Sequence, residues 1–221
     1  MVSYIRARKG AQKEERKQAI LDVARAMCAT APFAEVTMAA VADRAGLAKG
    51  TLYLYFKTKE ELVLALLEDQ LWSWFDLVDK RLVYLIRPSA GKVAALICET
   101  LAERPLLRRL LSILHALLEQ NLDYESALRF KSTALERLVK TGARREAALP
   151  FLPRGGGGQL LLTLHALVVG LQQMADPSPQ VARVLADPRM APLRVDFDAA
   201  LSYSLAALLH GLNRTRSRRK S

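Results

Sequence analysis

The sequence predicts an all-α fold, with a three-helix head at the N-terminus joined by a long helix to a larger helical body. Apolar residues recur at the three- and four-residue spacing of amphipathic helices along most of the 221 residues. No segment alternates polar and apolar residues as a half-buried strand does. With 51% hydrophobic and 25% charged residues, the composition is that of a folded globular chain. We expect a head at 1–66, a body at 67–213 and a short tail at 214–221.

The head has clear helix boundaries. Thr37 is a suitable N-cap, and Gly46 suits a tight left-handed turn at the end of the second helix. Pro32 ends the first helix, and Thr58 with Glu61 forms a capping box before the long helix. Helices are therefore expected at about 13–30, 38–45, 49–56 and 58–83.

The body continues the helical pattern. Pro105 suits a first helical turn, and Asp123 and Asp196 are suitable N-caps. The four-glycine run at 155–158 is interpreted as a flexible hinge between two helices. The expected helices lie at about 90–103, 106–120, 123–148, 159–175 and 197–212.

The net charge of +11 is concentrated at the two ends. Residues 1–66 hold 11 basic and 7 acidic residues, and the tail 214–221 holds 5 basic residues and no acidic one. This excess favours a polyanionic partner, with nucleic acid first and an anionic membrane surface second. Arg6, Arg8 and Lys9 form a basic N-terminal arm of the kind that reaches DNA, whereas we expect the tail to be disordered.

Other composition signals favour a cytoplasmic protein without a membrane segment. Cys28 and Cys98 lie 70 positions apart, which excludes a disulfide scaffold or a cysteine zinc site. The N-terminus has no apolar run behind its charges, so we do not expect a secretory signal. The most apolar stretch, 160–174, is too short and too interrupted to span a bilayer.

Residues 37–56 have the pattern of a helix-turn-helix. Leu52 and Phe56 are four apart and would point together into the core. The opposite side of the same helix then presents Gly50, Thr51 and Leu54, flanked by Tyr53 and Tyr55, with Lys49 at the helix start. Such an uncharged face can approach a major groove closely and meet phosphates at both rims.

The segment from Thr37 to Leu62 reads T-x-x-x-V-A-x-x-A-G-L-A-K-G-T-L-Y-x-Y-F-K-T-K-E-E-L. It resembles the DNA-binding head of TetR-family transcriptional regulators. The resemblance implies a homodimer that binds a pseudo-palindromic double-stranded operator, most often as a repressor. It further implies release of the DNA when a small molecule occupies a pocket in the body.

Carried onto this sequence, the resemblance implies a set of DNA contacts. Phosphate contacts fall on Thr37, Tyr53, Tyr55 and Lys59, and base-edge contacts on Lys49 and Gly50, with Thr51 and Leu54 on the same exposed side. Ala48 stands where a serine or threonine is common in the family, so one polar contact is absent here.

The two body helices expected at about 159–175 and 197–212 are apolar around more of their circumference than a single partner helix covers. We expect them to form a four-helix dimer interface, with an ordinary monomeric core as the alternative. The candidate interface residues are Leu164, Leu167, Leu171, Leu201, Leu205 and Leu208.

Large amphipathic or aromatic side chains in the body are candidates for an apolar effector pocket. They also suit simple core filling, and His115 suits a core histidine bonded to a backbone carbonyl. The candidates are Trp72, Phe75, His115, Leu118, Tyr124 and Met174, with Trp74 and Phe130 nearby in the pattern.

Enzyme motifs are absent from the sequence. No G-K-[ST] follows the glycine run, no G-x-S-x-G occurs, and His115, His165 and His210 lie far apart without a cysteine partner. We therefore expect no catalysis, metal or cofactor. The rival classes are a helical enzyme of unfamiliar type and a basic nucleoid or membrane-surface protein that does not read sequence.

Overall fold

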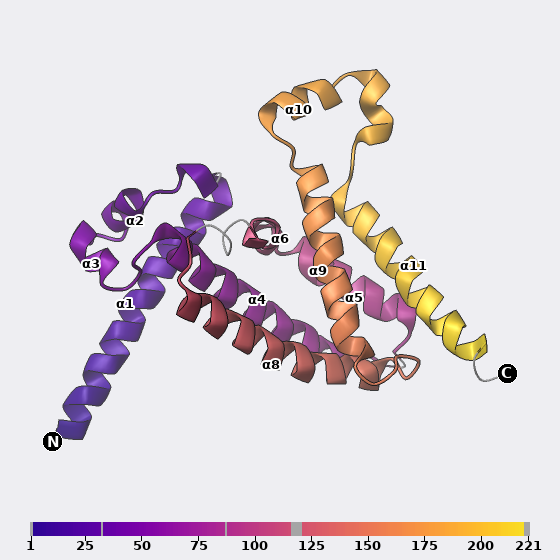
Figure 1. Ribbon diagram of the computed structural model, residues 1–221, viewed down its shortest axis with the longest axis horizontal. Coiled ribbons are helices and arrows are strands. Elements are labelled where there is room, and N and C mark those ends of the chain that lie inside the picture. Colours follow the sequence, from indigo (N-terminus) through magenta and orange to yellow (C-terminus); the bar gives the residue numbers. More distant parts are fainter. Residues whose placement is uncertain (1, 32, 87, 116–120, 219–221) are drawn as a thin grey trace. The chain divides into compact units, whose positions relative to one another are not determined.

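The computed structural model (Figure 1) describes residues 2–31, 33–86, 88–115 and 121–218, with side chains described from residue 11 to 214 of these ranges. The described residues form ten α-helices and two short 3-10 helices and contain no strand, which confirms the all-α prediction. The chain divides into two compact units. The first runs up to Asp69 and includes Leu114–Ala127, and the second comprises Gln70–Ile113 and the residues from Leu128 onward.

The first unit is built around a helix-turn-helix. Its elements are α1 (Val2–Thr30), η1 (Phe33–Glu35), α2 (Met38–Arg44), α3 (Lys49–Tyr53) and the first turns of α4 (Lys59–Val83). The helix α1 begins well before the predicted residue 13. Apolar periodicity marks the buried part of a helix, which starts at Ile20, whereas the earlier turns carry no such pattern in the sequence.

The predicted N-caps and the predicted glycine turn of these helices are confirmed residue by residue, whereas α3 ends at Tyr53, three residues before the predicted Phe56. The hydroxyl of Thr37 accepts from the Ala40 amide at 3.2 Å, and Gly46 has a φ of 64°. The hydroxyl of Thr58 accepts from the Glu61 amide at 3.1 Å, while the Glu61 carboxylate accepts from the Lys57 amide at 2.7 Å. These local bonds fix the entry into α2 and α4, and hence the positions of the helices around α3.

The core of the first unit joins α1 to the helix-turn-helix. The side chains of Ile20, Val41, Leu52 and Leu62 are fully buried. An ion pair also joins α1 to α4, because the guanidinium of Arg25 lies 2.9 Å from the Asp69 carboxylate. Burial of apolar surface along four helices holds one side of α3 against the core of the first unit, and the other side of α3 stays exposed.

The second unit packs its helices around a separate core. It contains the later turns of α4 with α5 (Ala90–Ala102), α6 (Pro105–Ser112), most of α8 (Tyr124–Ala148), α9 (Gly156–Ala175) and α11 (Phe197–Arg218). The helix α11 packs against α5 and α9, and α9 packs against α6. The predicted caps at Pro105, Asp123 and Asp196 are all confirmed.

Three predictions for the second half of the chain differ from the structure. The expected helix at 106–120 is interrupted at Ile113, which caps α6. Two short elements between α9 and α11, α10 (Pro179–Leu185) and η2 (Pro188–Leu193), were not predicted. Residues 214–218, expected to be disordered, continue α11, because nothing in their sequence breaks a helix.

The glycine run is a packing device, contrary to its interpretation as a hinge. Gly155 has a φ of 81° and caps α9, and Gly156–Gly158 form the first turn of that helix. A β-carbon on Gly157 would lie 2.0 Å from the carbonyl oxygen of Gly142 in α8. The glycines therefore allow two helix backbones to touch, which larger residues would prevent.

A buried ionic cluster joins α4 to α8 in the second unit. Arg145 is fully buried, and its Nη1 lies 3.4 Å from the carboxylate of Asp79 and 3.0 Å from the Thr141 carbonyl. Asp79 also accepts from the Thr141 hydroxyl at 3.1 Å and from Arg144. Burial lowers the pKa of Arg145 to about 10, so the guanidinium is still charged at neutral pH.

Within the described residues, no helix is long and apolar enough to cross a membrane. In the same part of the chain, no three His, Cys, Asp or Glu side chains gather as a group able to hold a metal ion.

Candidate nucleic-acid interface

The helix α3 presents the uncharged face that the sequence predicts. Leu52 is fully buried, and Phe56 just beyond the helix is buried beside it. On the opposite side Gly50 is exposed, Tyr53 is 41% exposed and Leu54 is 80% exposed. An isolated leucine so exposed has no role in the core, which suits a surface that becomes covered by a partner.

Further predicted contact residues lie on the elements around this face. Lys49 begins α3, and its ammonium lies 6.0 Å from the centroid of the Tyr53 ring. Thr37 is the exposed N-cap residue of α2, and its hydroxyl accepts from the Ala40 amide. Thr51 and Tyr55 are half-buried, and Ala48 supplies the N-cap of α3 without a side-chain bond. The structure thus brings the predicted residues around α3 onto one helix-turn-helix.

Lys59 has a partner within the head that the sequence did not indicate. Its ammonium donates to the carbonyl of Phe33 and, at 3.4 Å, to that of Ala34, and it lies 3.9 Å from the centroid of the Phe33 ring. Burial lowers the pKa of Lys59, although Glu60 opposes this effect. The side chain therefore ties the start of α4 to η1, and its predicted phosphate contact stays a prediction.

The aromatic candidates in the body form a cluster. The ring of Trp72 lies 5.9 Å from that of Phe75 and 6.1 Å from that of Phe130, while Trp74 and Phe75 lie 5.3 Å apart. The indole of Trp74 donates to Thr100 at 3.1 Å. Trp72 is half-buried, whereas the other three rings are buried.

Three of the remaining effector candidates are exposed. His115 is exposed, Tyr124 is 74% exposed and Met174 is 56% exposed. Leu118 lies outside the described residues.

The six candidate interface leucines divide into two groups. Leu164, Leu201 and Leu205 are buried by their own chain, so their side chains serve the core of the second unit. Leu167, Leu171 and Leu208 are half-buried at the edge of that core.

The fold and the exposed recognition helix define a helix-turn-helix transcriptional regulator with a helical C-terminal body. Residues 20–66 match the family described as bacterial regulatory proteins, tetR family. Residues 68–216, well over half of the chain, match the family described as tetracyclin repressor-like, C-terminal domain. The chain belongs to the TetR family of transcriptional regulators.

Two repressors are similar to part of the chain. This chain is 42% identical over 71 residues to the HTH-type transcriptional repressor KstR of Rhodococcus jostii (strain RHA1). The matched region is 32% of this chain and 31% of that protein. The chain is 47% identical over 57 residues to KstR of Mycobacterium tuberculosis (strain ATCC 25618 / H37Rv), which covers 26% of each. The chain thus spans about a third or less of the curated relatives it matches.

A solved structure is similar over most of the chain. It is the transcriptional regulator FadR from Bacillus subtilis in complex with stearoyl-CoA, with a TM-score of 0.50 and 21% identity. The likeness covers 87% of this chain and 96% of that one, and at this identity it shows the fold.

Proposed function

We propose that this regulator is a homodimeric repressor that binds a pseudo-palindromic DNA operator and releases it when a largely apolar molecule binds the body. The exposed, uncharged face of α3 carries the proposal. The recognition helix of a helix-turn-helix enters the major groove, where base edges are read, while neighbouring residues bind phosphates. Acting on the chromosome would place the protein in the cytoplasm.

Gly50 is the most informative residue of this face. A β-carbon there would meet nothing within 4 Å, so the fold does not require glycine. We attribute the glycine to close approach to DNA, because a side chain at this point would hold α3 away from the base edges. Lys49 beside it supplies a donor for guanine or phosphate, and Leu54 supplies an apolar contact of the kind that meets a thymine methyl.

The substitution Gly50→Leu tests this role. It should lower operator affinity at least about tenfold without lowering the melting temperature, since leucine is the better helix former. Gly91→Leu is the matched control, because Gly91 is also exposed in a helix with open space around its α-carbon. Unchanged DNA affinity in Gly50→Leu would remove α3 as the reading helix.

The dimer is best supported by the outer faces of α9 and α11. These helices pack against each other, and Leu164, Leu201 and Leu205 on their inner faces are already buried by the same chain. Their outer faces carry small or apolar residues at helical spacing, which allow close helix contact. The exposed or half-buried residues on these faces are Leu162, Ala166, Val169, Gly170, Ala199, Tyr203, Ala206 and Ala207.

Sedimentation of the full chain tests the dimer. We expect about 49 kDa, twice the 24.5 kDa of one chain. Tyr203→Glu should dissociate the dimer, because a carboxylate would be buried without a partner. Val184→Glu on α10 is the control, since Val184 is 59% exposed but lies outside these faces. A 24.5 kDa species for the unchanged chain would refute the homodimer.

The aromatic cluster of Trp72, Phe75 and Phe130 supports an apolar effector. The ring of Trp72 is accessible beside buried neighbours, as expected where a ligand can complete a partly filled apolar site. The neighbour of known structure is bound to stearoyl-CoA, which makes a long acyl chain a reasonable first probe.

Coupling to the DNA would pass through α4. This helix is continuous from Lys59, in the head, through the turns that carry Trp72 and Phe75. A coupling free energy of about 1–3 kcal/mol would change operator affinity roughly 5–150-fold, and operator DNA would weaken effector binding by the same factor. Quenching of tryptophan fluorescence by stearoyl-CoA, with matching loss of operator binding, would support the switch. Quenching without any change in DNA affinity would refute it.

A further inference from the structure

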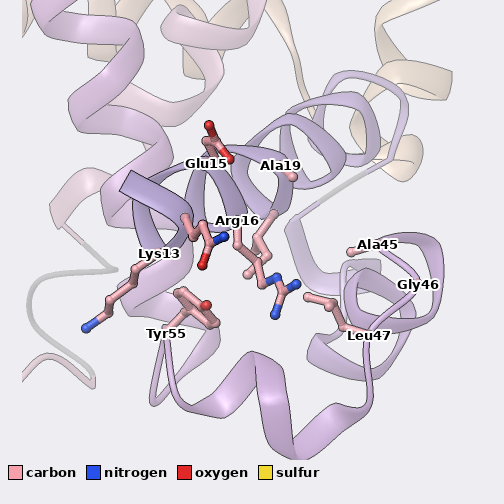
Figure 2. Close-up of a pocket in the computed structure, with 10 residues that line it drawn as sticks. Lys13, Glu15, Arg16, Ala19, Ala45, Gly46, Leu47 and Tyr55 are labelled. Atoms are coloured by element: carbon pink, nitrogen blue, oxygen red, sulfur yellow. The ribbon is translucent and has the colours of Figure 1, made fainter. Parts of the chain in front are cut away.

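The head contains an open cavity of about 890 Å³ beside the helix-turn-helix, shown in Figure 2. One wall is the exposed N-terminal part of α1, including Gln12, Lys13 and Arg16. The other wall is the turn between α2 and α3, centred on Gly46, together with Tyr55 just after α3. The cavity therefore adjoins the proposed reading helix.

The side chains on α1 share one face of that helix. Lys13 and Arg16 are three residues apart, a spacing that places side chains on the same side. In Figure 2 Arg16 extends between Tyr55 and the turn, and Lys13 lies on the side of Tyr55, whereas Glu15 points the other way. Within the described residues, neither Lys13 nor Arg16 makes an ion pair.

We propose that this cavity seats the DNA backbone beside the operator major groove, with Arg16, Lys13 and the hydroxyl of Tyr55 binding its phosphates. The inference rests on the proposed operator binding and extends its contacts from the helix-turn-helix to α1. Guanidinium, ammonium and phenol groups are donors suited to phosphate oxygens. The two donors on α1 lie outside the motif from Thr37 to Leu62, so they add to the contacts that the motif implies.

The openness of the cavity favours a polymer over a small free anion. Lys13 and Arg16 are exposed, and Tyr55 is half-buried. Exposed cations attract a single free anion weakly, because water screens the charge. A nucleic-acid backbone instead brings many phosphates at once and releases counterions as each is neutralised. The same donors that would hold free phosphate poorly can therefore add to DNA affinity.

The first experiment compares salt dependence for single variants of the full-length protein. The probe is the duplex that the unchanged protein selects from a random pool. Removing one cation that neutralises a phosphate lowers the slope of log affinity against log salt by about 0.9. Arg16→Ala or Lys13→Ala, present in both heads of a dimer, should lower it by about 1.8. Lys17→Ala is the matched control, a lysine of the same helix outside the cavity, and should keep the wild-type slope.

A methylphosphonate scan then locates the contact. Neutralising one phosphate per half-site should weaken the unchanged protein several-fold but should not weaken Arg16→Ala further. Glu15→Gln should tighten binding at low salt, because it removes a nearby negative charge.

The outcomes separate the two proposals. Failure to enrich any duplex would refute operator binding itself. If a duplex is enriched but Arg16→Ala and Lys13→Ala both keep the wild-type slope of log affinity against log salt, operator binding stands and only the proposed phosphate contacts in the cavity are wrong. Binding of pyrophosphate, detected by resonance shifts of the Arg16 side chain, would also overturn these contacts if Arg16→Ala and Lys13→Ala keep the wild-type dependence of DNA affinity on salt.

Discussion

The backbone of Gly157 in α9 lies directly against the carbonyl group of Gly142 in α8. A β-carbon on Gly157 would lie only 2.0 Å from the carbonyl oxygen of Gly142, so no residue with a side chain fits there. A β-carbon on Gly142 would in turn lie 2.7 Å from the Gly158 nitrogen. Neither neighbour is the flexible end of a side chain, so the clash can be relieved only by separating the helices.

Gly157→Ala is therefore expected to destabilise the protein by about 1–3 kcal/mol, as overpacking does. Chemical denaturation measures the change. Gly91→Ala, at an exposed helical position with open space, should be neutral or stabilising by up to about 1 kcal/mol. Equal effects of the two substitutions would contradict the close contact.

Asp79→Ala should be one of the most destabilising substitutions in the body. It leaves the charge of Arg145 buried without its carboxylate, which costs about 3–5 kcal/mol of stability. The control is Asp76→Ala, which removes the exposed pair with Arg137 on the same two helices and should cost about 0–1 kcal/mol. Pairing Asp79→Leu with Arg145→Met should recover much of the stability, and a lack of recovery would argue against an electrostatic origin.

Lys59→Met should lower the stability of the head by about 1–3 kcal/mol, because the ammonium no longer binds the carbonyls of Phe33 and Ala34. Lys57→Met is the control, since Lys57 is exposed and two residues away. Thermal unfolding measures stability, and the salt slope of operator binding measures any phosphate contact. An unchanged melting temperature would show that the internal contact contributes nothing.

Cys98 should react slowly with iodoacetamide in the folded protein. Burial, and then the nearby carboxylate of Asp198, raises the pKa of the thiol to about 11 from 9.0. At pH 8 the thiolate fraction is then about 100-fold smaller than in the chain unfolded in urea. The rate should rise about tenfold per pH unit up to about pH 11. The measurement uses Cys28→Ser to leave one thiol, and equal folded and unfolded rates would contradict the raised pKa.

Local signals made the head predictable. Thr37, Gly46 and the Thr58–Glu61 pair each act through bonds to backbone groups a few residues away, so their sequence neighbours suffice to identify them. The element α10 was missed although Ser178 and Pro179 form a usual helix start, with the serine hydroxyl accepting from Val181. Its short length leaves too few residues for apolar periodicity to be visible.

Features that depend on distant contacts could not be read from the sequence. The glycine run looks flexible until Gly142 is seen against it, and Asp79 looks like an ordinary surface carboxylate until Arg145 reaches it 66 residues later. Lys13 and Arg16 belong to a helix whose charge pattern suits solvent, and they gain meaning only beside Tyr55. The aromatic rings of the body are effector candidates from their residue type alone, and that they form one cluster could be seen only in the fold.

The role proposed for α3 is to read the base sequence of an operator. Its most direct test measures the affinity of the full-length chain for its selected duplex and for a scrambled duplex of the same composition, both near 150 mM salt. The selected duplex should bind at least about 1,000-fold more tightly, as specific regulators do. Equal affinity for the two duplexes would contradict it and would indicate a basic protein that binds DNA by charge alone.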